Sequence, residues 1–377
     1  MILTAVSKAN GLITLTRQHK RRELEEWRRS DNFFCPQCKG KLILKVGQVV
    51  IPHFAHISSN DCSSAFSEGE SADHLAGKQQ LYEFFQSYYP VQLEAVLDKI
   101  KQRPDLLVNN RFAIEYQCSP IPKDLFDHRN AGYKEIGIKP IWIIRTPTTL
   151  QELSDGIQLF SLSKFQQLFI PRRPLIGQTL LTYDNTNKSF LYASHLLPVQ
   201  QNQVIAKIRR LPIGSQQFPF LLVNPPTKRE LKIYEKIYSS KRRRFLSSRV
   251  LTSRKGLKDR FLRNCYMFRI RPEELPSFIG MPTAGSEIFE GHAVEWQANL
   301  IFHVIENGME DQSLDTFINR QPHLDRNLAW AAVNNFLLFL DQLGLCPLTP
   351  DCLRKSVPVE ILFELITPHF LAKRYEN

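Results

Sequence analysis

The succession of secondary-structure elements expected between residues 70 and 146 constrains the fold more than any other feature of this sequence. Periodicity and breaker residues predict a helix from about Glu70 to before Pro90, strands at 91–98, 104–108 and 111–118, a helix from about Pro122 to Ile136, and a strand at 139–146. Gly137 is expected to end the second helix. The order α-β-β-β-α-β predicts an α/β domain, which we place at residues 67–155.

The segments on either side of this domain predict an α/β multidomain chain, which its length also favours. Residues 1–66 contain a predicted hairpin around Asn10-Gly11, a charged helix and a second hairpin. Residues 156–377 predict a mainly α-helical C-terminal domain, with amphipathic stretches at 292–307, 325–343 and 358–372.

The cysteines become informative once the compartment of the protein is inferred. No apolar run approaches the ~20 residues that a membrane-spanning helix requires. The N-terminal MILTAVSKANG also lacks the charged and apolar regions of a secretory signal. The sequence therefore predicts a cytoplasmic protein without a membrane segment, in a compartment where thiols stay reduced. The seven cysteines are then expected to be metal ligands or buried thiols rather than disulfides.

A group of cysteines and histidines in the N-terminal segment has the spacing of a zinc site. Cys35 and Cys38 are separated by two residues, which lets two thiolates reach one ion from a tight turn. His53, His56 and Cys62 follow, so five candidates compete for four positions. We favour Cys35, Cys38, His56 and Cys62, with His53 as the substitute. Zinc would be structural, because so short a segment buries little core; the alternative is a Cys-x-x-Cys pair with unrelated histidines.

Asp105 and Glu115 are candidate ligands of a second metal ion on the predicted central hairpin. A two-residue loop at Asn109-Asn110 would place Asp105 opposite residue 114, whereas a three-residue loop, 109–111, would place it opposite Glu115. A shared metal therefore requires a loop of odd length or a bulge. Two carboxylates suit Mg²⁺ or Mn²⁺, which assist hydrolysis of phosphodiesters. The alternative is that both are ordinary surface acids of a hairpin.

The helix before this hairpin carries a stripe that is polar at its start and apolar further on. Glu70, His74 and Lys78 recur every four residues and share one face, which Leu81 and Phe85 continue. A core-facing stripe of this kind is typical of the edge of an active site. The alternative is a solvated first turn that is stabilised by i,i+4 pairs and by an acid near the helix N-terminus.

The positive charge of the chain is concentrated in one basic segment, residues 228–271. The net charge of the whole chain is +12, and this segment alone contains sixteen Lys and Arg against three acidic residues. Arg242, Arg243 and Arg244 lie in it among aromatic residues, a combination that suits single-stranded nucleic acid. The distribution argues against a uniformly basic, histone-like protein and predicts a local DNA-binding surface. A solvated helix face with its aromatic residues in the core is the alternative.

Taken jointly and in order, these motifs resemble the family of the bacterial competence protein CoiA. The motifs are C-P-x-C, H-F-A-H with a following Cys, E-x-x-x-H-x-x-x-K, P-D, and E-Y-Q-C-S-P. The resemblance covers about residues 1–146 closely. It implies a zinc-finger-like N-terminal domain, a central restriction-endonuclease-like fold of the PD-(D/E)XK type, and a role in recombination of incoming DNA during natural transformation.

The resemblance also implies roles for residues of the central domain. It places Glu70 at the helix-acid position, Asp105 at the PD position and Glu115 at the (D/E) position, with His74 and Lys78 at family-typical helix positions. Arg129 and Tyr133 match a further R-x-x-x-Y pattern that could line the site or bind phosphate.

Gln117 departs from the family pattern, since a lysine usually stands at its position. Glutamine is neutral and can only donate and accept hydrogen bonds. Either Lys78 supplies the missing cation from the facing helix, which we favour, or catalysis is weakened or lost.

Two functions remain in competition. The first is a metal-dependent nuclease that hydrolyses single-stranded or branched DNA, which the acids Glu70, Asp105 and Glu115 favour. The second is a non-catalytic DNA-binding mediator that assists a RecA-type recombinase or other competence proteins, which Gln117 favours. A zinc-stabilised protein-binding adaptor would explain neither the acids nor the basic segment.

Overall fold

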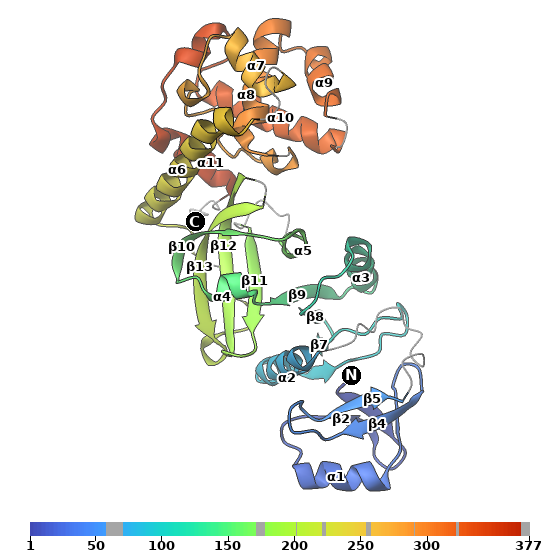
Figure 1. Cartoon of the computed structure of the whole chain (residues 1–377). Helices are drawn as coiled ribbons and strands as arrows, with labels where there is room; N and C mark the ends of the chain where they lie inside the picture. The colour runs from blue at the N-terminus through green and yellow to red at the C-terminus, as the bar shows by residue number, and fades with distance from the viewer. Residues whose placement is uncertain are drawn as a thin grey trace, which may run out of the picture. The chain divides into compact units, whose positions relative to one another are not determined.

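The protein forms two compact units, each with its own hydrophobic core (Figure 1). A computed structural model describes residues 1–57, 71–170, 178–200, 202–220, 224–253, 258–289, 291–321 and 324–370. Unit 1 comprises residues 1–151, 181–192 and 210–221, and unit 2 comprises the remainder. No helix in these ranges is both long and apolar enough to cross a membrane.

The elements follow the chain in the order that Figure 1 labels. Up to residue 151, all in unit 1, they are β1 (Thr4–Ser7), β2 (Gly11–Thr14), α1 (Arg21–Ser30), β3 (Phe33–Phe34), β4 (Lys41–Lys45), β5 (His53–His56), α2 (Ala72–Gln86), β6 (Val91–Leu93), β7 (Leu106–Val108), β8 (Phe112–Gln117), α3 (Lys123–Glu135), β9 (Lys139–Arg145) and α4 (Thr148–Gln151). The rest are β10 (Gly156–Ser161), α5 (Lys164–Gln167), β11 (Thr179–Asp184), β12 (Ser189–Gln200), β13 (Gln203–Pro212), α6 (Lys228–Thr252), α7 (Arg260–Met267), α8 (Ala293–Asn307), α9 (Asp311–Asn319), α10 (Arg326–Gln342) and α11 (Val359–Phe370).

The N-terminal part of unit 1 is a sheet with strand order β2-β1-β3-β4-β5. The predicted hairpin around Asn10-Gly11 is present, because β1 and β2 pair antiparallel from Thr4–Thr14 to Ser7–Gly11. Gly11 has a φ of 68°, a value that glycine adopts at little cost. An isolated bridge between Ile2 and Phe54 ties the start of the chain to β5. The first residues of the chain are therefore an integral part of this sheet.

The second sheet of unit 1 is mixed and contains the predicted α-β-β-β-α-β succession. Its strands lie in the order β11-β9-β8-β7-β6, in which β9 is parallel to both β8 and β11, and the pairs β7–β8 and β6–β7 are antiparallel. The β7–β8 loop consists of residues 109–111. Asn109 and Asn110 have φ values of 50° and 51°, left-handed values that asparagine adopts more readily than most residues.

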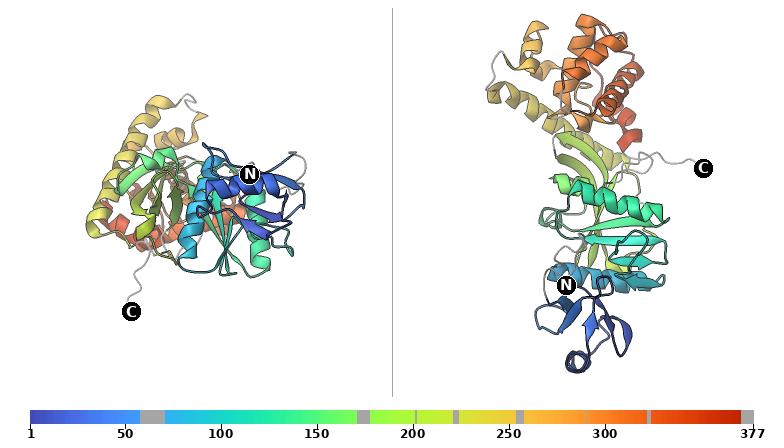
Figure 2. Two further views of the ribbon diagram at one scale, coloured as in Figure 1. Left: turned by 90° about the horizontal axis from the view of Figure 1, so that it is seen from below. Right: turned by 90° about the vertical axis from the view of Figure 1, so that its right-hand side faces the viewer.

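Helices α2 and α3 cover opposite faces of this sheet (Figure 2). Gly77 of α2 lies so close to the ring of Tyr116 that an added Cβ would be 2.1 Å from it. Tyr133 of α3 donates a hydrogen bond to Glu115 instead. Because successive residues of a strand point to opposite faces, Glu115 and Tyr116 of β8 assign one helix to each face. This arrangement decides which helix supplies partners to which acid.

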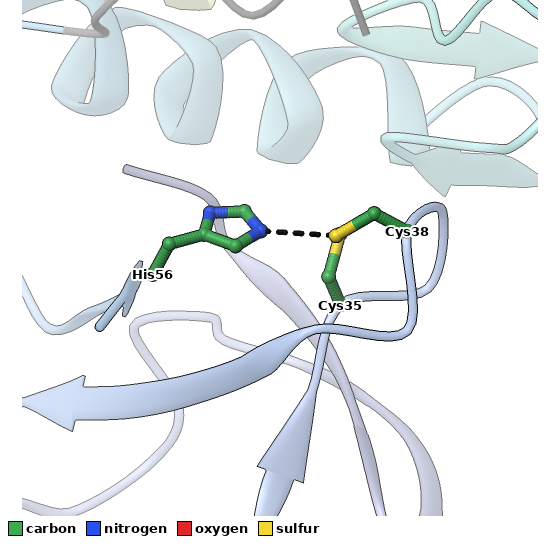
Figure 3. Close-up of side chains that lie close together, drawn as sticks. All are labelled: Cys35, Cys38 and His56. Atoms are coloured by element: carbon green, nitrogen blue, oxygen red, sulfur yellow. Dashed lines mark hydrogen bonds between the residues drawn. The ribbon is translucent and has the colours of Figure 1, made fainter. Parts of the chain in front are cut away.

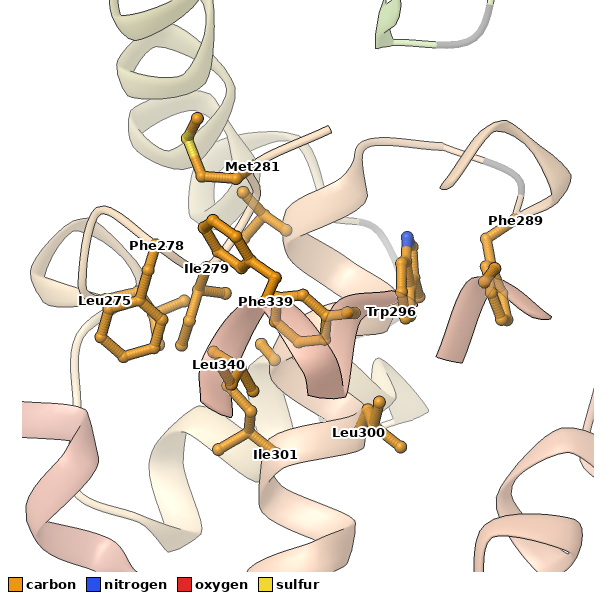
Figure 4. Packing of buried hydrophobic residues seen from close by; sticks show 14 of the residues in the cluster. Leu275, Phe278, Ile279, Met281, Phe289, Trp296, Leu300, Ile301, Phe339 and Leu340 are labelled. Carbon is orange, nitrogen blue, oxygen red and sulfur yellow. The ribbon is translucent and has the colours of Figure 1, made fainter. Parts of the chain in front are cut away.

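The helical core of unit 2 is formed by α6 to α11 (Figure 4). Phe278, Leu300, Ile301, Phe339 and Leu340 are among its buried side chains. The three amphipathic stretches predicted in this region correspond to α8, α10 and α11.

Residues 156–212 depart from the expectation of a mainly helical C-terminal domain. They contain the strands β10 to β13, and β10 pairs antiparallel with β13 from Gly156–Ile208 to Ser161–Gln203. The prediction is wrong here because β12 is buried along almost its whole length. A strand buried on both faces lacks the polar–apolar alternation by which strands are recognised in a sequence.

Candidate active site and metal centre

Three of the predicted zinc ligands lie together at the edge of the N-terminal sheet (Figure 3). One ligand atom from each of Cys35, Cys38 and His56 falls within 4.8 Å of the others, and Cys38 Sγ lies 3.3 Å from His56 Nε2. The turn between the cysteines is closed by a hydrogen bond from the Cys35 N–H to the Gly40 carbonyl, 2.8 Å, and Lys39 adopts a φ of 61°. Two thiols and an imidazole fit the ligand preference of zinc, so this group could hold such a metal.

The other two candidates for this metal have different positions. His53 Nδ1 lies 2.9 Å from the Ile51 carbonyl, and the ring does not join the Cys35–Cys38–His56 group in the described part of the chain. Burial lowers the pKa of His53, which keeps its imidazole neutral at physiological pH. Cys62 lies outside the described residues, so its role as the fourth ligand stays a prediction.

Asp105 and Glu115 lie opposite each other at the open end of the β7–β8 hairpin. The register pairs Leu106 with Ile114, and its continuation by one residue pairs Asp105 with Glu115. The three-residue loop is thus the odd-length loop that a shared metal requires. Burial raises the pKa of Glu115, and the charge of Asp105 adds to this rise, as expected for neighbouring carboxylates.

The carboxylate of Asp105 is bound by α2 and by the backbone of β8. His74 Nε2 lies 3.1 Å from Asp105 Oδ2, and the Tyr116 N–H donates to the same oxygen at 2.8 Å. Lys78 Nζ lies 3.5 Å from Oδ1. Burial alone would raise the pKa of Asp105, but the charges of His74 and Lys78 and these hydrogen bonds hold it well below its ordinary value. Asp105 is therefore ionised at neutral pH.

Lys78 is fully buried and is shared by two carboxylates. Its Nζ lies 2.6 Å from Glu94 Oε1 in addition to its contact with Asp105. Burial alone would raise the pKa of Glu94, but the charge of Lys78 is the largest of the effects that lower it below its ordinary value. Sequence reasoning misses Glu94, because the alternating segment 91–98 predicts a strand. The chain instead leaves the strand at Glu94, whose φ is 50°.

Glu115 is bound from the opposite face, by α3. Arg129 and Tyr133 both donate to Glu115 Oε1, and Arg129 also donates to the Arg103 carbonyl at 3.1 Å. Burial raises the pKa of Glu115 to about 7, although the charge of Arg129 opposes this shift. The two residues of the predicted R-x-x-x-Y pattern therefore line the site next to the second acid.

Gln117 and Glu70 are the two remaining residues of the predicted central site. The Gln117 side chain donates from Nε2 to the Ser119 carbonyl at 2.8 Å. It has no charge to offer at the position where a lysine is usual. Glu70 lies outside the described residues, so its position beside His74 and Lys78 remains a prediction from helical spacing.

The basic segment begins with one long helix, α6, which has an exposed basic face and a buried one. Lys232, Lys236 and Arg243 are exposed, and none of the three forms an ion pair within the described ranges. Tyr234 and Tyr238 on the other face are buried in the core of unit 2, as the alternative interpretation of the aromatic residues expects.

Arg242 does not belong to the exposed face of this helix. Its guanidinium donates to the backbone carbonyls of Leu275, Pro276 and Ile279, at 3.0, 2.7 and 2.8 Å. These bonds engage Nε and one terminal nitrogen of the guanidinium, so Arg242 braces the helical core, and its role in DNA binding stays a prediction. Arg243 and Arg244 are exposed, and their role in DNA binding stays a prediction.

Comparison with known proteins matches both regions of this site. The model of the family "Competence protein CoiA, N-terminal domain" matches residues 16–65, and that of "Competence protein CoiA, nuclease-like domain" matches residues 70–252. The Competence protein CoiA of Bacillus subtilis (strain 168) is 38% identical over 186 residues, which are 48% of this chain and 48% of that protein. The chain thus spans about half the length of the curated relative it matches. No solved structure matches the chain significantly.

Proposed function

Because the chain belongs to the CoiA family of competence proteins, we propose that it processes DNA in natural competence as a metal-dependent nuclease. Its substrate would be incoming DNA, single-stranded or branched, and its action would promote recombination of that DNA during transformation. The matched nuclease-like domain contains Asp105, Glu115 and Lys78, and these residues support the proposal. The αβββαβ succession around them is the order expected of the PD-(D/E)XK type.

The observation that carries the proposal is the position of Lys78 beside Asp105. The ammonium lies 3.5 Å from Asp105 Oδ1, on the helix that faces the hairpin. Because the ammonium is fully buried, it would act without touching the substrate: its fixed positive charge beside Asp105 can offset the negative charge that builds on a phosphodiester held at that residue. Lys78 thereby offers the cation that Gln117 lacks, which favours the enzyme over an inactive relative of the fold.

The acids of the site fit a divalent cation of the magnesium type. Asp105 and Glu115 would contribute hard oxygen ligands from adjacent strands, which is the donor set that Mg²⁺ and Mn²⁺ prefer. Such an ion would supply Lewis-acid polarisation of the phosphodiester when bound. His74, which contacts Asp105, holds the orientation of that carboxylate, and Arg129 and Tyr133 do the same for Glu115.

Cleavage assays test this function. Labelled single-stranded and branched DNA would be incubated with the full chain and Mg²⁺ or Mn²⁺. Activity should require the metal and should disappear in Asp105→Asn and Glu115→Gln, while Asp127→Asn, which changes an exposed acid of α3, should cleave like the wild type. Cleavage that persists in both site variants cannot come from this site and would refute the proposal.

A second candidate function is favoured by the exposed face of α6. Lys232, Lys236 and Arg243 offer unneutralised charge for a DNA backbone without any catalytic group. In this case the chain would be a DNA-binding mediator that assists a RecA-type recombinase, with the nuclease-like domain as a platform. Absence of metal-dependent cleavage together with DNA binding that depends on α6 would favour this alternative.

A further inference from the structure

Glu94 connects the N-terminal sheet to the candidate active site. Its carboxylate contacts Lys78 of α2 on one side and the start of β1 on the other. Leu3, one of its donors, is 91 residues away along the sequence. Glu94 itself is buried, and its φ of 50° is one that a residue other than glycine holds only when its surroundings fix it.

Both carboxylate oxygens of Glu94 are occupied by donors from the protein. Oε1 accepts from the Leu3 N–H at 2.9 Å and from Lys78 Nζ at 2.6 Å. Oε2 accepts from the Thr4 N–H at 3.0 Å and from the Thr4 hydroxyl at 2.6 Å. A carboxylate with this many donors is a fixed counter-charge rather than a metal ligand. We assign the metal to Asp105 and Glu115, which face each other across the β7–β8 hairpin, and not to Glu94.

We infer that Glu94 is a positioning residue that holds the Lys78 ammonium at Asp105, and that it does so only while β1 of the N-terminal sheet is docked against it. The catalytic meaning of this inference rests on the proposed nuclease function, whereas the positioning itself does not. In this account the N-terminal sheet completes the active site without contributing a reacting group.

The physical reason lies in the flexibility and burial of lysine. Its ammonium sits on a four-carbon stem that is free to rotate, and a buried charge is costly unless it is paired and hydrogen-bonded. Two carboxylates on different elements, Glu94 and Asp105, fix Lys78 Nζ in one place. Since most of the hydrogen bonds that Glu94 accepts come from Leu3 and Thr4, its own position depends on the start of β1.

The same contacts tie the Cys35–Cys38–His56 group to the active site. β1 belongs to the sheet that contains β4 and β5, and His56 is the last residue of β5. A metal that stabilises this sheet therefore also stabilises the strand on which Glu94 depends. This gives the metal group a role in activity although its ligands lie on a different sheet from Asp105.

A matched pair of variants at Thr4 tests the inference with little change in volume. Thr4→Val removes the hydroxyl that donates to Glu94, whereas Thr4→Ser retains it. The reactivity of Lys78 toward an amine-labelling reagent is measured by mass spectrometry in the full-length protein, with exposed Lys123 as the internal reference. We expect Thr4→Val to increase the relative labelling of Lys78 several-fold and Thr4→Ser to restore values near those of the wild type.

The cleavage reaction provides the second readout. Loss of one hydrogen bond to a charged group should lower kcat roughly tenfold in Thr4→Val, with KM nearly unchanged, because substrate binding does not involve Glu94. Glu94→Gln should have a larger effect in the same direction; if it fails to fold, the Thr4 pair still decides the question.

The outcomes separate this inference from the proposed function. Lys78 labelling that is unchanged in both Thr4→Val and Glu94→Gln overturns the inference, even if the wild type cleaves DNA. Labelling that rises in a protein that shows no cleavage supports the positioning role and contradicts the nuclease proposal instead.

Discussion

Asp105 and Glu115 stand opposite each other across the β7–β8 hairpin, yet each is held by a different helix. His74 and Lys78 of α2 bind Asp105, and Arg129 and Tyr133 of α3 bind Glu115. The two acids are therefore brought together by the sheet and oriented from its two faces. This explains how a hairpin this short can present two carboxylates at one point.

The Arg129–Glu115 pair should dominate the stability of this part of unit 1. Arg129→Met leaves the buried Glu115 without its cation and should cost about 3 kcal/mol of unfolding free energy. Adding Glu115→Gln should recover part of that loss, because a neutral amide is easier to bury than an unpaired charge. Urea unfolding followed by tryptophan fluorescence, to which Trp142 next to Arg129 contributes, measures both. Additive losses in the double variant would contradict the pairing.

Metal binding at the two acids should depend on pH through Glu115. Its pKa is raised to about 7, so it is protonated below that pH in the metal-free protein, whereas the lowered pKa of Asp105 keeps that residue ionised. Mn²⁺ affinity should therefore rise as the pH passes through about 7, with release of close to one proton per ion at about pH 6 and of few at about pH 8. Calorimetry in buffers of different ionisation enthalpy counts these protons. Equal proton release at both pH values would contradict the assignment.

The raised pKa of Glu115 also predicts how the stability of the folded protein changes with pH. Because the folded-state pKa of Glu115 lies above the ordinary value of 4.5, the folded protein binds this proton more tightly than the unfolded chain. The stabilisation from Glu115 is thus fully present below about pH 4.5 and is lost as the pH rises through about 7. Glu115→Gln should remove this part of the pH dependence of urea unfolding.

The sequence alone predicts those parts of the candidate site that depend on the local spacing of residues. The i, i+4 spacing of His74 and Lys78 predicts that they share a face, and the register argument states the loop length that Asp105 and Glu115 require. Glu94 escapes such reasoning, because its role depends on Leu3 and Thr4, about 90 residues earlier in the chain.

Two other features of the structure could not be inferred from the sequence, for physical reasons of the same kind. Arg242 resembles its basic neighbours in sequence, yet it faces three carbonyls that come from a distant loop. The strand β12 lacks a polar–apolar alternation because it is buried on both faces. In each case tertiary contacts, which no local pattern records, decide the outcome.

The Cys35–Cys38–His56 group predicts one zinc ion per chain. Cys35→Ser should abolish zinc binding and destabilise the N-terminal sheet, since structural zinc contributes directly to folding. Cys265→Ser, which changes a buried cysteine of α7, is the control and should retain the ion. Metal content is measured by mass spectrometry of the purified protein. Retention of zinc in His53→Asn and its loss in Cys62→Ser would identify the fourth ligand.

The exposed face of α6 should govern the salt dependence of DNA binding. If Lys232, Lys236 and Arg243 each contact one phosphate, replacing all three with Gln should reduce the slope of log affinity against log salt by roughly 2 for single-stranded DNA. Arg242→Gln should leave the slope unchanged and lower the stability of unit 2, because it loses hydrogen bonds to the Leu275, Pro276 and Ile279 carbonyls. A salt slope that changes in Arg242→Gln but not in the triple variant would contradict this assignment of DNA binding to the exposed face of α6.

The central claim is that Lys78 supplies the cation that position 117 lacks, and single-turnover DNA cleavage with Mn²⁺ tests it most directly. The chains compared are the wild type, Lys78→Met, Lys78→Met with Gln117→Lys, and Lys123→Met as the control for an exposed lysine. Each is checked for folding by circular dichroism. We predict a loss of about 100-fold or more in Lys78→Met, partial recovery when lysine is restored at position 117, and no change in Lys123→Met. Cleavage by a folded Lys78→Met protein at the wild-type rate would contradict the account.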